Sequence, residues 1–353
     1  MLHAIWFQLA LVTLALHAGR MLEHSMTTDA VVITCHGRSG STLTERMFDK
    51  NPKAVSYFEP LRPWEKCNCF DHMHRAKSLI DSTIAMLNCD FSAPVLQKCT
   101  WHNKLGVHPL MPRADGKTRE PHILSVINAS VSACSERIAA ARGMIAVKLI
   151  RIPGLLHLLV DQSRGLMPAG RRLFVLHLIR DPRALLHSRN RVGWGQPSKL
   201  LKNGVARWAG TICSQTLKDM DAGDALMARG GDNGVLYIRV LYEDLVQSPI
   251  ATLDRVYGLL GRSVPPAVAN FFRMRVPGIA RGQRGLQADR QVKKKPKWER
   301  HQKLYGTRTS KSLPELVDGW QSALSLEAVA AIETRPKCRS MMAKLNYSLT
   351  AKP

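Results

Sequence analysis

The sequence predicts an α/β fold in which helices flank a doubly wound parallel sheet. Two observations carry this prediction: short runs that are apolar at almost every position, and helical segments that alternate with these runs along the chain. Strands buried on both faces are continuously apolar, and their alternation with helices is typical of parallel sheets. The predicted strands are Ala30–Cys35, Met144–Ile150, Leu173–Ile179 and Val235–Val240.

A helix is expected after each predicted strand, and local signals at the helix ends support this interpretation. Pro52 closes the first helix, and Asp181 can cap the third, which has Pro182 in its first turn. The predicted helices are Leu43–Lys50, Leu155–Asp161, Pro182–Asn190 and Pro249–Leu260.

The domain organisation follows from length and composition. With 353 residues and 45% apolar content, the chain can bury one large core or two ordinary ones. We expect an N-terminal segment over residues 1–28 and one domain over residues 29–353. Residues 61–140 show no strong period and hold five of the eight cysteines. We interpret them as an inserted, partly helical region.

The charge of the chain points to an anionic partner. Its 51 Lys and Arg residues against 27 Asp and Glu residues give a formal net charge of +24. Nucleic acid, a membrane surface, a nucleotide or an acidic polysaccharide would each satisfy this charge. Residues 281–311 carry eleven basic and two acidic residues, and glycines mark them as loop. This segment is either a solvated basic loop or an electropositive wall beside an anion site.

The cysteines and the N-terminus indicate a secretory route. Eight cysteines fit several disulfides in an oxidising compartment, and sequons begin at Asn128 and Asn346. The apolar run Ala4–Leu16, followed by Arg20, suits a cleaved signal peptide, a short signal-anchor or a buried helix. Its place at the N-terminus argues against the buried helix, and of the other two interpretations we expect the anchor, with the domain on the lumenal side.

A glycine-rich loop after the first predicted strand is the first chemical signal. Glycines allow a tight turn, and amide groups at the start of the next helix favour an anion. Hydroxyls add donors, and Arg38 adds a permanent cation whose fork matches phosphate oxygens. The spacing of a Walker A loop is absent, which argues against an ordinary nucleotide kinase. The loop and its flanking residue comprise His36, Gly37, Arg38, Ser39, Gly40, Ser41 and Thr42.

A second anion loop is expected where the third predicted strand ends. Arg180 lies at the strand end, Asp181, Pro182 and Arg183 start the helix, and Ser188 lies two turns into it. Ligands of open α/β sheets bind beyond the carboxyl ends of the strands. Two such loops suit a nucleotide with phosphates at both ends of its ribose. That description fits 3′-phosphoadenylyl sulfate (PAPS).

At this point the sequence resembles a known family, the membrane-bound Golgi carbohydrate 6-O-sulfotransferases. Residues 36–60 (HGRSGSTLTERMFDKNP…YFEP) resemble their 5′-phosphosulfate loop, and residues 173–189 (LFVLHLIRDPRALLHSR) resemble their 3′-phosphate loop. Residues 145–159 and 242–261 are similar in order and spacing. The chain departs from the family in Gly37, because the family commonly places Thr or a bulkier residue before the loop arginine.

The resemblance implies a P-loop-like sulfotransferase domain that uses PAPS and needs no metal. It implies transfer of the sulfuryl group to a sugar hydroxyl, the 6-hydroxyl of GlcNAc, Gal or GalNAc in a glycan or proteoglycan chain. It also implies attachment to the Golgi membrane as a single-pass type II protein, or secretion if the N-terminal segment is cleaved. The oligomeric state stays open.

The chemistry needs an anion clamp and a general base. We assign the role of the clamp to Arg38. Arg180 and Ser188 are expected to bind the 3′-phosphate. Glu59 lies where related Golgi enzymes carry a catalytic carboxylate, and apolar neighbours would raise its pKa. A structural Glu before a proline and a base at His36 remain alternatives. Lys148 and Arg151 would line the acceptor cleft or form an ordinary ion pair.

Three further hypotheses stay in view. The run Cys67–His74 contains zinc-ligand residue types, but its spacing is unusual and disulfides are favoured. A nucleotide kinase of related fold is a second hypothesis, but the lysine of a Walker A loop is absent from this sequence. A non-enzymatic heparin or polyanion binder would explain the charge but not the paired loops, and no nucleic-acid motif is recognised, so we expect no nucleic-acid partner.

Overall fold

The computed structural model describes the parts of the chain that build the sheet and the helices around it. These parts are residues 28–61, 75–91, 131–136, 139, 143–164, 171–194, 205–231, 234–275 and 313–350. The expected N-terminal segment, the basic loop over residues 281–311 and the Cys67–His74 run lie outside the described residues. The division into segment and domain therefore stays a prediction.

A five-stranded parallel sheet forms the centre of the protein, with the strand order β2-β3-β1-β4-β5. All four strand pairs are parallel, and β1 lies between β3 and β4. The predicted parallel sheet is confirmed, with the four predicted strands shifted by at most one residue at an end. The strands are β1 (Asp29–Cys35), β2 (Ala54–Phe58), β3 (Met144–Leu149), β4 (Leu173–Ile179) and β5 (Val235–Leu241).

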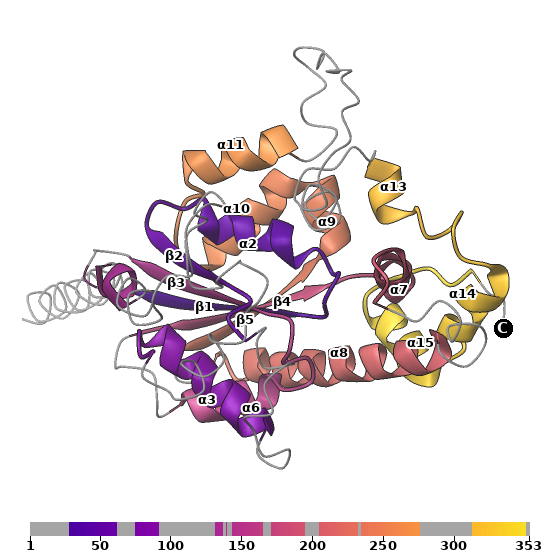
Figure 1. Cartoon of the computed structure of the whole chain (residues 1–353), viewed down its shortest axis with the longest axis horizontal. Helices are drawn as coiled ribbons and strands as arrows, with labels where there is room; N and C mark the ends of the chain where they lie inside the picture. Colours follow the sequence, from indigo (N-terminus) through magenta and orange to yellow (C-terminus); the bar gives the residue numbers. More distant parts are fainter. Residues whose placement is uncertain are drawn as a thin grey trace, which may run out of the picture.

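Helices cover both faces of the sheet, which makes it doubly wound (Figure 1). One face carries α2 (Ser41–Asp49), α9 (Tyr242–Gln247), α10 (Pro249–Leu259) and α11 (Pro266–Arg275). The other face carries α3 (Arg75–Leu87), α6 (Leu156–Ser163) and α8 (Val205–Ala228). Beyond one end of the sheet lie α7 (Pro182–Arg191), α13 (Leu313–Val317), α14 (Leu326–Glu333) and α15 (Pro336–Lys344).

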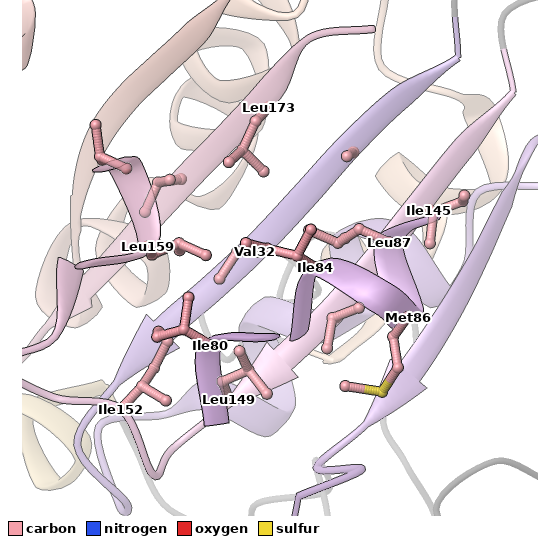
Figure 2. Packing of buried hydrophobic residues seen from close by; sticks show 14 of the residues in the cluster. Val32, Ile80, Ile84, Met86, Leu87, Ile145, Leu149, Ile152, Leu159 and Leu173 are labelled. Atoms are coloured by element: carbon pink, nitrogen blue, oxygen red, sulfur yellow. The ribbon is translucent and has the colours of Figure 1, made fainter. Parts of the chain in front are cut away.

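Two cores result, because successive side chains of a strand point to opposite faces. Val31 and Ile33 of β1 pack with α2, α10 and α11, whereas Val32 packs with α3 and α6. Figure 2 shows the second core, where Ile84 of α3 lies in the same cluster as Val32 and Ile145. The seven residues of β1 are all buried, as are those of β4. The continuous apolar runs are thus explained by burial on both faces.

Two disulfides are present among the described residues. Cys89, just after α3, pairs with Cys134, and Cys213 of α8 pairs with Cys338 of α15. The second bridge ties α15 to α8, the longest of the described helices. Cys35 is free and buried at the end of β1. This pairing agrees with the expectation of several disulfides.

Candidate active site

The carboxyl edge of the sheet gathers the residues that the sequence singled out. Because all five strands are parallel, the segments that follow β1, β2, β3 and β4 leave the sheet at the same edge. Arg38 follows β1, Glu59 follows β2, Arg151 follows β3 and Arg180 follows β4. Residues up to 142 positions apart in the chain therefore become neighbours, as the hydrogen bond between Arg180 and Arg38 shows.

The loop after β1 turns directly into α2, and Gly40 makes this turn possible. Gly40 has a φ of 95°, which glycine adopts freely. A Cβ at Gly40 would lie 2.1 Å from the ring of Tyr242, so the ring packs on the bare backbone. Because α2 begins at Ser41, its first amide groups have no carbonyl partner within the helix. The start of α2 is therefore suited to bind an anion.

Arg38 joins this loop to the one after β4. Its backbone is in the left-handed region, with a φ of 81°. Its Nε donates to Oγ of Ser188 at 3.3 Å, and its carbonyl oxygen accepts from Nη1 of Arg180 at 3.0 Å. The two predicted anion loops are thus in direct contact. One small molecule could reach both of them.

Arg180 is held on three sides and keeps one donor for a ligand. Its guanidinium lies 4.2 Å from the centre of the Tyr242 ring, and Nη2 donates to the Leu316 carbonyl of α13 at 2.9 Å. Its Nε is buried and has no hydrogen-bond partner among the described residues. A buried donor without a partner costs free energy, which an acceptor oxygen would recover. The site therefore fits a phosphate group.

Glu59 lies between two cations at the end of β2. Its Oε1 is 3.1 Å from Nζ of Lys148, and its Oε2 is 3.3 Å from Nη1 of Arg151. Its backbone has a φ of 47°, and its amide donates to the Lys148 carbonyl at 3.2 Å. The surroundings of the carboxylate are therefore ionic rather than apolar as the sequence suggested. The two cations fix the position of the carboxylate at the end of β2.

Lys148 connects Glu59 to the phosphate loop. Its side chain is fully buried, its Nζ lies 3.4 Å from Oγ1 of Thr42, and it lies 3.4 Å from the centre of the Phe58 ring. The sequence left open whether Lys148 and Arg151 line a cleft or form an ion pair. The structure shows the ion pair, and its carboxylate partner is the candidate base itself.

His36 is packed against α8 rather than placed as a base. Its Nε2 lies 3.2 Å from the Ile212 carbonyl, to which it can donate. Burial, with smaller effects of Arg189 and His177, lowers the pKa of His36 from 6.5 to about 3. A neutral imidazole that donates to a carbonyl of α8 is engaged in packing. This geometry favours Glu59 over His36 as the base.

The start of α7 holds its own loop in place. The Asp181 side chain accepts from the Arg183 amide at 2.8 Å, which confirms the predicted cap, and Pro182 follows in the first turn. The Arg183 side chain is buried between Asp181 and Glu333, over the Trp320 ring. These side chains shape the loop. It stays a prediction that donor binding involves Asp181, Pro182 and Arg183.

Sequence reasoning missed Arg189 and Tyr242. Nε of Arg189 donates to the Gly37 carbonyl at 3.0 Å, so α7 holds both ends of the Gly37–Arg38 segment. Tyr242 supports Gly40 and Arg180 with one ring. The position of Arg189 next to Ser188 was the available signal for the first. The position of Tyr242 directly after a strand was the signal for the second.

Neither a metal-binding cluster nor a membrane-spanning helix is found in the part of the chain that the structure describes. No group of three or more His, Cys, Asp or Glu side chains in the described ranges is arranged to hold a metal ion. Within the same ranges, no helix has the length and apolar character needed to cross a membrane. The zinc hypothesis for Cys67–His74 and the anchor hypothesis for Ala4–Leu16 concern residues outside these ranges.

Comparisons with known proteins agree with the resemblance found in the sequence. Human carbohydrate sulfotransferase 1 is 27% identical over 237 residues, which cover 64% of this chain and 49% of that protein. Human carbohydrate sulfotransferase 2 is 23% identical, covering 90% of this chain and 64% of that protein. The chain thus spans about half the length of the first curated relative. The predicted relationship to carbohydrate sulfotransferases is confirmed at this level, although no family model matches the chain.

Solved structures that resemble the protein include two sulfotransferase domains. The domain of the Synechococcus PCC 7002 olefin synthase has a TM-score of 0.42 and 21% identity, covering 88% of this chain and 95% of that one. The domain from the curacin biosynthetic pathway has a TM-score of 0.44 and 15% identity, covering 92% of this chain and 100% of that one.

Proposed function

We propose that this chain, a relative of the carbohydrate sulfotransferases, transfers a sulfuryl group from PAPS to a hydroxyl of a sugar. One observation carries the proposal: Arg38 touches Ser188 through its side chain and Arg180 through its carbonyl. Two anion loops that meet in this way suit the two phosphate-bearing ends of one nucleotide. The names of the relatives support the reaction class.

The donor would be held by residues of both loops. Bound PAPS supplies the activated sulfuryl group. Arg38 and the amide groups of Ser39–Thr42 would bind the 5′-phosphosulfate end and stabilise the charge that develops on the leaving phosphate. Nε of Arg180 and Oγ of Ser188 would bind the 3′-phosphate. The Arg38–Ser188 contact joins one residue of each loop, and we expect both side chains to exchange this contact for phosphate oxygens.

The acceptor would be activated by Glu59. A sugar hydroxyl is a weak nucleophile, and a positioned base contributes about 10²–10⁴-fold to such a step. The Glu59 carboxylate takes the hydroxyl proton as the hydroxyl oxygen attacks the sulfuryl group. Lys148 and Arg151 hold the two carboxylate oxygens in place, at 3.1 and 3.3 Å. The base is thus already oriented before the acceptor binds, so the entropic cost of orienting it does not add to the reaction barrier.

The finer features of the proposal rest on sequence. The resemblance to 6-O-sulfotransferases supports the 6-hydroxyl of GlcNAc, Gal or GalNAc, in a glycan or glycosaminoglycan chain, as the acceptor. The sequons, the N-terminal apolar run and the two disulfides support a lumenal domain of a Golgi membrane protein. The net charge of +24 supports an acidic polysaccharide acceptor.

Transfer of labelled sulfate from PAPS to a panel of desulfated glycans, with the product position mapped, tests the reaction and the acceptor together. Retention on immobilised 3′,5′-ADP tests the donor site separately. We expect Arg180→Ala and Ser188→Ala to weaken retention and Arg229→Ala, at an exposed position just after α8, to leave it unchanged. Ser188→Ala is included as a second test, because Arg180→Ala also removes the hydrogen bonds of Arg180 to the carbonyls of Arg38 and of Leu316 in α13.

The alternatives give different results in these assays. A polyanion-binding protein would elute from immobilised 3′,5′-ADP with salt alone, both as the wild type and as Arg180→Ala. A nucleotide kinase would transfer phosphate from ATP and would transfer no sulfate. Either result would reject the proposed function.

A further inference from the structure

Trp194 lies on the phosphate loop although it belongs to the segment after α7. Its amide donates to the Arg189 carbonyl at 3.1 Å, which turns the chain back after the helix. Its ring lies against Gly37: a Cβ on Gly37 would be 2.5 Å from Cζ3 of Trp194 and 3.4 Å from Cδ1 of Ile150. The indole thus stands beside the residue that precedes Arg38. Gly37 is the reason it can approach so closely.

Gly37 lies between the Trp194 ring and the segment that leads to Glu59's partner. The other side chain near a Cβ on Gly37 is Ile150, the residue directly after β3 and directly before Arg151, which pairs with Glu59. Arg180 packs instead on Tyr242, which follows β5. In the strand order, β3 and β5 lie on opposite sides of β1. The indole therefore lies next to the segment that leads to Arg151, while the Trp194 amide ties it to the end of α7, which carries Ser188.

A second exposed tryptophan extends the same surface. Trp194 is 43% exposed and Trp208, in the first turn of α8, is 48% exposed. The Arg189 guanidinium lies 5.8 Å from the centre of the Trp208 ring, while its Nε donates to the Gly37 carbonyl. Trp320, the third tryptophan among the described residues, is buried. The Trp208 ring and the Trp194 backbone thus both lie next to Arg189, whose side chain binds the phosphate loop.

We infer that Trp194 is the surface on which the pyranose ring of the acceptor sugar stacks, and that Trp208 binds the next sugar of the chain. This inference rests on the proposed function. The face of a pyranose presents C–H groups, which carry slight positive charge and suit the electron-rich face of an indole. Stacking through that face leaves the hydroxyls at the sugar edge free. One of them can then reach Glu59 beside Arg38.

Kinetics of Trp194→Ala and Trp194→Phe test the inference. We expect the KM for a glycan acceptor to rise about three- to tenfold in Trp194→Ala, with Trp194→Phe in between. The KM for PAPS and retention on 3′,5′-ADP should stay unchanged. Trp208→Ala should raise the KM for an oligosaccharide and leave that for a monosaccharide acceptor unaltered. Leu326→Ala, at an 84% exposed position on α14, is the matched control.

Glycan binding measured without turnover separates this inference from the proposed function. With 3′,5′-ADP present, binding of the desulfated glycan panel to immobilised protein should weaken in Trp194→Ala. If the wild type transfers no sulfate but binds a glycan through Trp194, the function is wrong and the inference stands. Weaker 3′,5′-ADP retention in Trp194→Ala would mean that the indole stacks on adenine instead. That result, unchanged acceptor binding in Trp194→Ala, or no glycan binding by the wild type would overturn the inference.

Discussion

Replacing Lys148 by Met tests whether the buried ammonium group holds the candidate base. Methionine keeps the length and the apolar stem of the side chain but removes the charge, so packing changes little. The ammonium group has three partners: Glu59 at 3.1 Å, Thr42 at 3.4 Å and the Phe58 ring at 3.4 Å. Two of these partners belong to the proposed reaction site. Both stability and turnover should therefore respond.

The contacts of Lys148 and Glu59 predict which variant loses more free energy of unfolding. Breaking a buried ion pair by removing one partner costs about 3–5 kcal/mol. Lys148→Met should lie at the lower end, because the Glu59 carboxylate keeps Arg151 at 3.3 Å and is 13% exposed. Glu59→Gln should lie at the upper end, because it leaves an ammonium group that is fully buried. The double variant should recover about 1–3 kcal/mol relative to the sum of the single ones.

Urea unfolding of the wild type, the two single variants and the double variant measures this coupling. The same proteins are then assayed for sulfate transfer and for retention on 3′,5′-ADP. We expect kcat to fall about 10²–10⁴-fold in Glu59→Gln. It should fall less in Lys148→Met, whose base is intact but less well held. Retention on 3′,5′-ADP should persist in both, because the donor contacts are made by other residues.

Two results would refute this reasoning. If the free energies of unfolding add to within about 0.5 kcal/mol, Lys148 and Glu59 do not interact and the ion pair has no energetic meaning. If Glu59→Gln weakens donor retention but leaves kcat unchanged, Glu59 is not the base. Arg151→Met serves as the comparison, since it removes the other cation of Glu59 and leaves the buried pair intact.

Three further predictions concern charge, pH and the C-terminal region. Arg38→Ala should abolish sulfate transfer while the thermal unfolding temperature stays near that of the wild type; near-normal activity would remove Arg38 from the mechanism. Burial lowers the pKa of His36 and of His177 from 6.5 to about 3, so unfolding below pH 6.5 takes up protons. Stability should therefore be complete above pH 6.5 and fall by up to about 1.4 kcal/mol per pH unit for each histidine as the pH drops towards 3. Urea midpoints between pH 5 and 7.5 measure this slope, and an equally steep slope in His177→Gln would contradict the assignment. Cys213→Ala together with Cys338→Ala opens a bridge that spans 125 residues and should cost about 4–5 kcal/mol of stability, measured by urea unfolding; an unchanged midpoint would show that the bridge adds nothing.

The sequence was sufficient to predict the strands that are buried on both faces. In β1 and β4 every residue is buried, so the apolar run is continuous and the strand is recognisable without its neighbours. By contrast, β2 was missed. It has five residues, of which only Tyr57 is buried, because it pairs with β3 alone at the edge of the sheet. The short β2 therefore lacks the continuous apolar run on which the prediction depended, whereas the other edge strand, β5, keeps such a run and was predicted.

The long helix α8 was also not predicted, although it is central to the second core and to the site. Its Asp219 accepts from the amides of Gly154 and Leu156, which positions the segment that follows Arg151. Its Ile212 carbonyl binds His36. These contacts join segments between 63 and 176 residues apart in the chain. Local sequence patterns contain no information on such distant partners, so the ionic surroundings of Glu59 and the position of Trp194 on Gly37 could not be predicted either.

The backbone adds an argument for the two residues assigned to catalysis. Four residues other than glycine have a left-handed backbone among the described residues: Arg38, Glu59, Cys89 and Asn346. Asn tolerates this conformation, and Cys89 lies in a turn that a disulfide fixes. Arg38 and Glu59 have neither reason, and each such conformation costs about 1–3 kcal/mol. It persists because surrounding contacts enforce it: Arg180 on the Arg38 carbonyl, and Lys148 and Arg151 on the Glu59 carboxylate. Strain that neighbouring side chains maintain at the ends of two strands is expected where a clamp and a base must be aimed at the same point.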